Sequence, residues 1–288
     1  MKNKKLRIGR IPYANLFPLF YYLDKKCDCS SYRFINGVPS VLNKMLRQGK
    51  LDISPSSSVE YLRYKKYYQV LPGLSISSSG PVRSILLFSK FPLNELGGKT
   101  IALSSESDTS VVLLKIILRE FLSIKCRFKT LIGKSIKKAL SSNAAVLLIG
   151  DAAMREAKKH PVVSCQLSVV SKKPKTNNYL PTAKSPIYIY DLGEMWYKHT
   201  GLPFVFALWI VKKKMLVHKK ELIEKISLDL IDAKKYAAKK FPLIARHAPQ
   251  KKWFGEKNLI NYWKCISYDF TDRHMEGLRL FERYAFKK

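Results

Sequence analysis

Residues 40–62, SVLNKMLRQGKLDISPSSSVEYL, contain a complete helix, a short strand and the start of a second helix. Ser40 can cap the first helix, and Gly49 suits the position just after its last turn. Between them, apolar side chains recur at the spacing of one helix face. LDIS then predicts a strand, and PSSSVEYL turns into the next helix. With the alternating segment KLRIGRI (5–11) before it, the stretch predicts a parallel α/β sheet.

A second α/β unit is predicted over residues 92–160. SILLFS (84–89) and KTIAL (99–103) are apolar runs typical of buried strands, and a long apolar helix follows the second run. A strand at 144–149 repeats the pattern, with Gly150 at the turn and Asp151 at the N-cap of a helix. FVFALWIV (204–211) predicts a further buried strand. Helices are predicted near 219–240, 256–266 and 272–285.

The composition describes a globular chain. Its 288 residues are enough for two domains of about 100–200 residues, and a hydrophobic content of 47% excludes a disordered chain. We expect no membrane span, since no apolar run reaches about 18 residues. Polar residues interrupt the basic N-terminal segment where a signal peptide would be apolar, so we expect a cytoplasmic protein. The oligomeric state is not predicted.

The five cysteines do not form a metal-binding pattern. Cys27 and Cys29 make a lone C-x-C, the other three are scattered, and no histidines stand at metal-ligand spacing. We therefore expect reduced structural thiols and no metal site.

The charge is strongly positive. Fifty-three Lys and Arg residues face 21 Asp and Glu residues, which gives a net charge of +32. Such a charge suggests nucleic-acid binding, but the basic residues are spread along the chain and no nucleic-acid-binding motif accompanies them. A lysine-rich solvated surface is the alternative. The same field favours an anionic small molecule, so nucleic acid is not the expected partner.

Small polar residues stand at three predicted helix starts. They are Ser56, Ser57 and Ser58, then Thr109 and Ser110, then Gly150 and Asp151. Helix starts expose unpaired N–H groups and bind carboxylates or phosphates, and in open α/β sheets they lie where ligands bind. The same residue types are also ordinary N-caps. The pattern leaves both readings open: plain capping, or an anion-binding cleft.

Known catalytic motifs are absent. The chain has no G-x-S-x-G, no P-loop, no G-x-G-x-x-G and no H-E-x-x-H sequence. Its histidines lie away from the Ser/Thr turns, so the sequence offers no evident general base.

Six segments in order resemble the chorismate dehydratase family of the futalosine route to menaquinone. They run from IGRIPYANLFPLFYYL near the N-terminus to YDLGEMWYKHTGLPFVFALWIV, and include GVPSVLNKMLRQGKLDISPSSSVEYLR, LPGLSISSSGPVRSILLFSK, LNELGGKTIALSSESDTSVVLLKIIL and LLIGDAAM. The resemblance covers residues 7 to about 211, and the helical tail is compatible with it.

The resemblance implies a type II periplasmic-binding-protein-like fold, with two α/β lobes around a cleft. The first lobe would comprise residues 1–88 and 204–288, and the second 89–203, with crossover strands near 84–91 and 203–212. The second lobe is longer than expected, so 160–187 is interpreted as an insertion.

The implied reaction converts chorismate, a dianion, to 3-[(1-carboxyvinyl)oxy]benzoate and water, without a cofactor or metal. By motif, Asn15 in PYAN acts at the ring hydroxyl or at developing charge, and Ser84 is a cleft serine. Substrate carboxylates would be held by Ser56, Ser57, Thr109 and Ser110. Gly150 and Asp151 match a family IGD motif, where Asp151 is a cap, a cleft residue or both. Ala14 replaces a larger apolar residue.

Two features of the residues remain open. Asn15 can simply satisfy local backbone groups, as asparagine often does in turns. The missing base suggests the hypothesis that a substrate carboxylate accepts the ring proton.

Two alternatives share the fold: the sister enzyme that forms 1,4-dihydroxy-6-naphthoate, which carries a catalytic histidine in the second lobe, and a non-catalytic cytoplasmic anion-binding protein.

Overall fold

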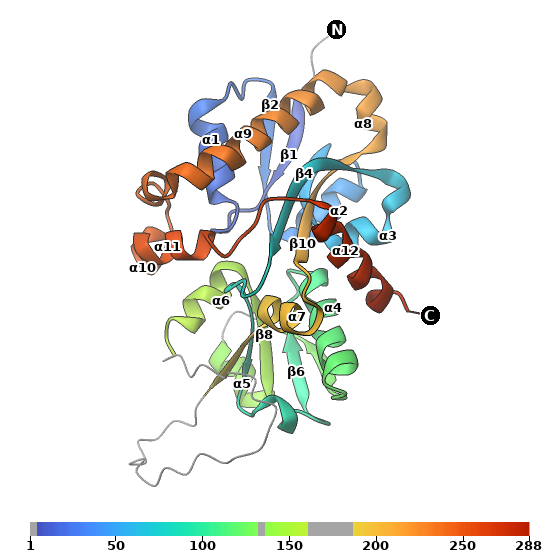
Figure 1. Ribbon diagram of the computed structural model, residues 1–288, viewed down its shortest axis with the longest axis vertical. Coiled ribbons are helices and arrows are strands. Elements are labelled where there is room, and N and C mark those ends of the chain that lie inside the picture. Colours follow the sequence, from blue (N-terminus) through green and yellow to red (C-terminus); the bar gives the residue numbers. More distant parts are fainter. Residues whose placement is uncertain (1–4, 132–135, 161–186, 288) are drawn as a thin grey trace.

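The chain folds into two α/β lobes, each built around a five-stranded sheet (Figure 1). The computed structural model describes residues 5–131, 136–160 and 187–287. The predicted α/β class and its two sheets are confirmed. Most of the predicted insertion at 160–187 lies outside the described residues.

The first sheet has the strand order β2-β1-β3-β10-β4. Strand β1 pairs in parallel with β2 and β3, whereas β10 is antiparallel to both β3 and β4. The late strand β10 therefore completes a sheet begun by the first part of the chain. The strands are β1 (Leu6–Arg10), β2 (Tyr32–Asn36), β3 (Ile53–Ser57), β4 (Tyr68–Ser78) and β10 (Phe204–Lys212).

Helices cover this sheet from both ends of the sequence. The long helix α9 packs against α1 and β4, and α11 packs against α9. Pro242 lies within α9, and the helix is kinked at Lys240. The predicted tail helices are confirmed. The helices of this lobe are α1 (Phe17–Lys26), α2 (Pro39–Arg47), α3 (Ser58–Arg63), α8 (Lys213–His218), α9 (Lys220–Ala245), α10 (Lys251–Phe254), α11 (Glu256–Trp263) and α12 (Asp272–Ala285).

The second sheet has the strand order β7-β6-β8-β5-β9. Strands β6, β7 and β8 are parallel, and β5 is antiparallel to β8 and β9. The elements are β5 (Ile85–Ser89), β6 (Thr100–Leu103), β7 (Arg127–Thr130), β8 (Ala145–Ile149), β9 (Tyr188–Asp191), α4 (Asp108–Ile116), α5 (Ile136–Ser142), α6 (Gly150–Ala157) and α7 (Leu192–Thr200). A π-helical turn at Ile117–Phe121 extends α4.

The chain passes between the sheets twice, at residues 79–84 and at 201–203. The Asp191 carboxylate fixes the first passage, because it accepts the N–H groups of Val82 and Arg83 at 3.0 and 2.6 Å while also capping α7. At the second passage, the rings of Trp196 and Phe281 pack on Phe204, with centroids 5.1 and 4.9 Å away. Both passages are therefore tightly packed.

Local capping differs from the sequence predictions in two places. Helix α2 begins at Pro39 with Val38 as its N-cap residue, so Ser40 lies inside the first turn and does not cap it. Proline is favoured at the first helical position because its φ is already helical. Helix α6 begins at Gly150 after Ile149, and Asp151 is not its N-cap. The predicted role of Gly49 is confirmed, since it has a left-handed φ of 75° after α2.

Candidate active site

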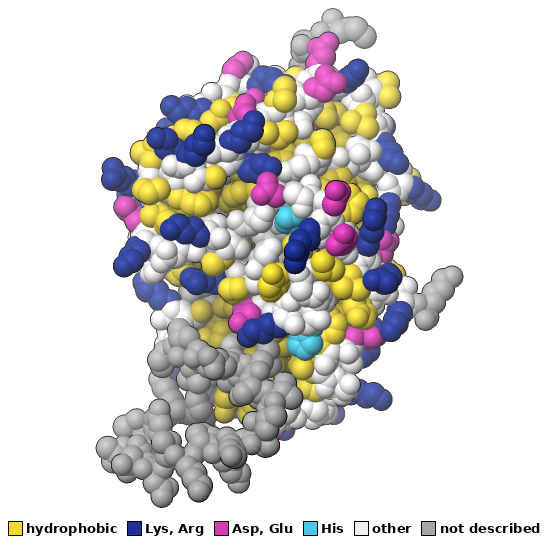
Figure 2. Space-filling view, viewed as in Figure 1, with side chains coloured by type: hydrophobic (Ala, Val, Ile, Leu, Met, Phe, Trp, Pro, Cys, Tyr) yellow, Lys and Arg dark blue, Asp and Glu magenta, His cyan; other side chains and the backbone are white. Residues whose placement is uncertain are grey.

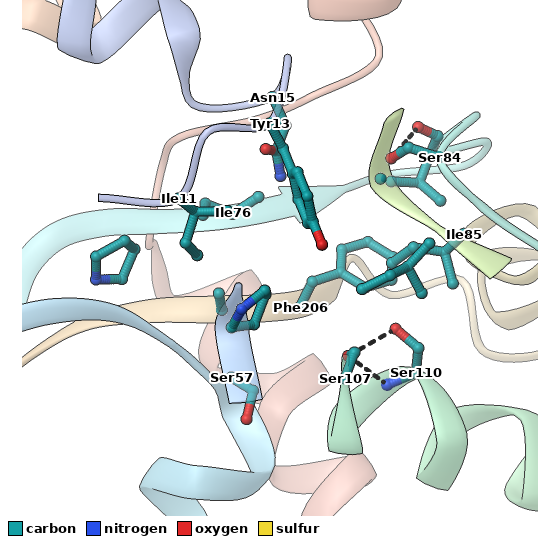
Figure 3. A pocket seen from close by; sticks show the side chains of 16 residues that line it. Ile11, Tyr13, Asn15, Ser57, Ile76, Ser84, Ile85, Ser107, Ser110 and Phe206 are labelled. Atoms are coloured by element: carbon teal, nitrogen blue, oxygen red, sulfur yellow. Dashed lines mark hydrogen bonds between the residues drawn. The ribbon is translucent and has the colours of Figure 1, made fainter. Parts of the chain in front are cut away.

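A cavity lies between the two lobes, at the carboxyl ends of β1, β3 and β8 (Figure 3). Both lobes and the first passage between them contribute to its wall. Its free volume is about 60 Å³. The wall is formed by Ile11, Tyr13, Asn15, Pro39, Pro55, Ser57, Ile76, Val82, Ser84, Ile85, Ser107, Ser110, Ile149, Gly150, Phe206 and Ala207.

Five of the eight site residues predicted from the sequence line this cavity. They are Asn15, Ser57, Ser84, Ser110 and Gly150. The other three, Ser56, Thr109 and Asp151, are not among the lining residues.

Asn15 lies in the loop between β1 and α1. Its Oδ1 atom is buried and accepts no hydrogen bond from any described residue. Its backbone oxygen accepts the Tyr268 hydroxyl at 2.5 Å, and the neighbouring Ala14 oxygen accepts the Trp263 indole N–H at 2.8 Å. The C-terminal part of the chain thus fixes the loop backbone. Among the described residues, the amide oxygen therefore does not satisfy a local backbone group.

Ser84 ends the first passage between the lobes. Its Oγ accepts a hydrogen bond from the Tyr262 hydroxyl at 2.9 Å and donates one to the Val82 oxygen at 3.3 Å. Its backbone oxygen accepts the Gly150 N–H at 2.7 Å. The serine is therefore held between an α11 side chain and the start of α6.

Ser57 ends β3 and is the N-cap of the short helix α3. Its Oγ accepts the Glu60 backbone N–H at 3.3 Å and the Asn43 amide N–H at 3.0 Å. Both acceptor positions of the hydroxyl are therefore used. Its own proton remains to be donated, and Ser57 borders the cavity.

On the opposite lobe, Ser107 is the N-cap of α4 and accepts the Ser110 N–H at 3.3 Å. The two hydroxyls lie 3.0 Å apart, and both line the cavity. The start of α4 thus places two serines on the cavity wall, at the end of the helix whose dipole favours an anion. Thr109 faces away, because its Oγ1 accepts the Val59 N–H at 3.0 Å and ties α4 to α3.

Tyr13 crosses between the lobes. Its hydroxyl donates to Glu106 Oε2 at 2.6 Å, and its ring lies against Gly150. Gly150 has a φ of 59°, and a Cβ there would lie 2.8 Å from the ring carbon Cδ2 of Tyr13. Glycine is thus needed both for the backbone and for the contact.

The two remaining predicted residues have structural contacts. Asp151 accepts the Ala14 N–H at 2.8 Å and the Gln250 side-chain N–H at 3.1 Å, so it joins α6 to the first lobe. Burial raises the pKa of Asp151 above its ordinary value, and the bonds from Ala14 and Gln250 partly oppose this shift. Ser56 is fully buried in β3, and its Oγ has no hydrogen-bond partner among the described residues.

The cavity offers neutral donors and no base. Of the described residues that line it, Tyr13 alone has an ionisable side chain. Burial and then the bond to Glu106 raise the pKa of Tyr13 far above its ordinary value, so it stays neutral. Within the described ranges, no group of three His, Cys, Asp or Glu side chains could hold a metal ion.

Several contributors were not predicted from the sequence. Ser107 had a signal, since a serine three residues before Ser110 matches an N-cap spacing. Tyr13 had none, because its partner Glu106 lies 93 positions away. Tyr262 and Asn43 likewise reach the serines only through the tertiary fold.

Positive charge is spread over the visible face rather than gathered in one stripe, as Figure 2 shows. Among the described residues, no helix is both long and apolar enough to cross a membrane.

Comparison with known proteins identifies close relatives. The chain matches a family model described as menaquinone biosynthesis over residues 6–287. A chorismate dehydratase of Thermus thermophilus is 33% identical over 207 residues, covering 72% of this chain and 70% of that protein. A chorismate dehydratase of Campylobacter jejuni is 29% identical over 218 residues, covering 74% and 71%.

Solved structures share the fold at low sequence identity. A protein from Archaeoglobus fulgidus has a TM-score of 0.72 at 16% identity, over 98% of this chain and 96% of that one. A Candida albicans protein described as having the generic periplasmic binding protein fold has a TM-score of 0.60 at 12% identity, over 98% and 90%. The expected periplasmic-binding-protein-like fold is thereby confirmed. Since the family match spans nearly the whole sequence, the chain belongs to the menaquinone biosynthesis family.

Proposed function

We propose that this protein is a chorismate dehydratase, a hydro-lyase that converts chorismate to 3-[(1-carboxyvinyl)oxy]benzoate and water in the futalosine route to menaquinone. The observation that carries the proposal is the lobe-to-lobe cavity with hydroxyls and a helix start on its wall, in a chain that is 33% identical to a chorismate dehydratase.

The cavity suits a small dianion. Ser57 lies on one lobe and Ser107 and Ser110 on the other, so each lobe can take one carboxylate. None of the described lining residues is Lys or Arg, so the donors are neutral and the net charge of +32 supplies only the long-range field. These donors favour a small anion over a nucleic acid, whose phosphates are held mainly by cations.

The lobes must separate before the substrate enters. The free volume of about 60 Å³ is well below the ~150 Å³ of a cavity that binds benzene, and chorismate is larger than benzene. The structure therefore represents a closed form. The Tyr13–Glu106 hydrogen bond and the Thr109 contact to Val59 join the lobes in this form.

The reaction needs one proton to leave the ring carbon that bears the enolpyruvyl ether, and hydroxide to leave the neighbouring carbon. No described residue on the cavity wall can accept a proton at neutral pH. A carboxylate of the substrate therefore takes the proton, and the leaving hydroxide recovers a proton as water. Aromatisation of the ring drives the step. The protein supplies orientation and fixed dipoles.

Asn15 and Ser84 are the proposed catalytic residues. The Asn15 Oδ1, unpartnered in the described structure, can accept a hydrogen bond from the ring hydroxyl, and the amide N–H groups can donate to the negative charge that develops there. Ser84 faces the same cavity from the passage between the lobes. Ser57, Ser110 and the Gly150 turn bind the substrate. Ser56, Thr109 and Asp151 support these residues through the fold.

We propose that residues 1–88 and 204–288 form one lobe and 89–203 the other. Sheet membership places the first boundary slightly earlier, because β5 (Ile85–Ser89) belongs to the second sheet. A cytoplasmic location is part of the proposal. The four described cysteines are all free thiols, which suits a reducing compartment.

The decisive experiment is incubation of the purified protein with chorismate. The expected product has the mass of chorismate less one water and an aromatic absorbance. Asn15→Ala is expected to keep its melting temperature and to lose about 100-fold in kcat, the usual effect of removing one preorganised polar group. Asn143→Ala is the matched control, because the Asn143 amide donates to the Ala139 oxygen at 2.8 Å, just before β8 and at the opposite end of that strand from the cavity.

Two outcomes favour other functions. Tight binding of chorismate without turnover would support a non-catalytic anion-binding protein. Formation of 1,4-dihydroxy-6-naphthoate from the cyclic futalosine derivative would support the sister enzyme. That reading expects a catalytic histidine, and no described lining residue is one.

A further inference from the structure

Tyr262 lies directly behind the cavity wall. It belongs to α11, is 1% exposed and does not line the cavity. Its hydroxyl lies 2.9 Å from Ser84 Oγ. The phenol is the donor in this bond. Burial raises the pKa of Tyr262 above its ordinary value of 10.0, so the phenol keeps the proton that it donates.

The backbone around Ser84 is fixed by other contacts. The Ser84 oxygen accepts the Gly150 N–H at 2.7 Å. Asp191 accepts the N–H groups of Val82 and Arg83, the two residues that precede Ser84. Removing the Tyr262 hydroxyl would therefore change the environment of the Ser84 side chain and leave the passage between the lobes in place.

A serine hydroxyl accepts two hydrogen bonds and donates one. Tyr262 uses one acceptor position of Ser84, so the Ser84 proton points elsewhere. In the described structure this proton is donated to the Val82 oxygen at 3.3 Å, beyond the usual O–H···O range of about 2.5–3.0 Å. Because this bond is long and Ser84 lines the cavity, an acceptor on a bound substrate can take the proton in place of Val82.

We propose that Tyr262 is a positioning residue that holds the Ser84 hydroxyl as a hydrogen-bond donor toward the substrate. The inference rests on the proposed function. Hydrogen bonds in a chain polarise one another, so a serine that accepts from Tyr262 is also a stronger donor. Without this partner, the Ser84 hydroxyl keeps only its long bond to the Val82 oxygen, and it can rotate to present a lone pair to the anionic substrate.

The test is a double-mutant cycle on chorismate turnover, with Tyr262→Phe, Ser84→Ala and the double variant. Tyr262→Phe is expected to lower kcat about tenfold, with less than a twofold change in KM, because tenfold corresponds to about 1.4 kcal/mol, which is within the range of one hydrogen bond. In the Ser84→Ala background the same substitution is expected to have no further effect on kcat. If Tyr262 had only a structural role, Tyr262→Phe would lower kcat by the same factor in the wild-type and Ser84→Ala backgrounds.

Tyr32→Phe is the matched control. Tyr32 is 5% exposed on β2, and its hydroxyl donates to Asp229 at 2.6 Å, on the first lobe and away from the cavity wall. The kcat of the Tyr32→Phe variant is expected to stay within twofold of the wild-type value. The inference is overturned if Ser84→Ala lowers kcat and Tyr262→Phe does not, or if the two effects add.

Failure of the proposed function gives a different result. If the wild-type protein binds chorismate without turnover, the cycle is measured on the Kd for chorismate, and the same non-additivity is expected. If Tyr262→Phe does not fold, 3-fluorotyrosine at position 262 retains the hydroxyl as a stronger donor. We then expect the protein with 3-fluorotyrosine at position 262 to differ at least twofold in kcat from the protein with 3-fluorotyrosine at position 32. Equal kcat values for the two proteins overturn the inference.

Discussion

Gly150→Ala tests whether the start of α6 is built around the Tyr13 ring. The residue has a φ of 59°, where a side chain costs about 1–2 kcal/mol, partly offset by about 0.4–1 kcal/mol from a stiffer unfolded chain. The new Cβ would also lie 2.8 Å from Tyr13 Cδ2, closer than the ~3.5–4.0 Å of an ordinary carbon contact. Overpacking of this kind costs about 1–3 kcal/mol. The expected total loss in the free energy of unfolding is about 2–4 kcal/mol.

Gly201→Ala separates the two contributions. Gly201 has a φ of 67° at the end of α7, and a Cβ there meets no atom within 4 Å. It should therefore show the backbone cost alone, about 1 kcal/mol. Equilibrium urea denaturation measures both variants, and an unchanged m-value confirms that only stability has changed.

The contact with Tyr13 can be isolated directly. In a Tyr13→Ala background the ring is absent, so Gly150→Ala should cost no more than Gly201→Ala. Chorismate turnover should also fall in Gly150→Ala, because the displaced ring enters a cavity with a free volume of only about 60 Å³. The reasoning is refuted if Gly150→Ala and Gly201→Ala are equally stable in the wild-type background.

Two further predictions concern charged contacts. Tyr13→Phe removes the bond to Glu106 that joins the closed lobes, so KM for chorismate should rise about tenfold with little change in the urea midpoint, and an unchanged KM would contradict this role. Burial opposes ionisation of Asp52, but its bonds to Arg7 and Lys219 outweigh burial and lower its pKa below 3.8. Its stabilisation is therefore present above about pH 4 and lost as the pH falls through the folded pKa. Asp52→Asn should lower the free energy of unfolding by about 3 kcal/mol at pH 7, and the variant should lose less stability than the wild type when the pH is lowered. Parallel curves of stability against pH for the two proteins would contradict this.

The sequence determined the elements whose signals are local. The helix–strand–helix order of residues 40–62 and the strands at the apolar runs 84–89 and 204–211 appear as predicted, because hydrophobic periodicity reports burial directly. The strand predicted at 51–54 is shifted, since β3 runs from Ile53 to Ser57 and takes in residues predicted as the turn into the next helix. Strand β4 was not predicted, since Pro72 and Gly73 interrupt its pattern. The pairing of β10 with β3 and β4 was also invisible, because it joins segments far apart in the sequence.

At the candidate site, the sequence picked out the polar residues of an apolar neighbourhood. Asn15 and Ser84 were marked by their motifs, and both line the cavity. Residue type could not decide orientation. Ser56 and Ser57 are adjacent and chemically identical, yet successive strand residues face opposite sides of a sheet, so only Ser57 lines the cavity.

The tertiary structure alone decided which groups control those residues. Trp263 and Tyr268 hold the backbone of the Asn15 loop, and Tyr262 holds the hydroxyl of Ser84. These contacts span 178 to 253 positions of sequence, and the C-terminal residues show only a helical pattern and buried aromatic side chains. A hydrogen bond depends on the position and direction of two atoms, which periodicity and composition do not encode. The sequence therefore determined which polar residues the cavity wall contains. The packing of the C-terminal residues against both lobes determined how those residues are oriented.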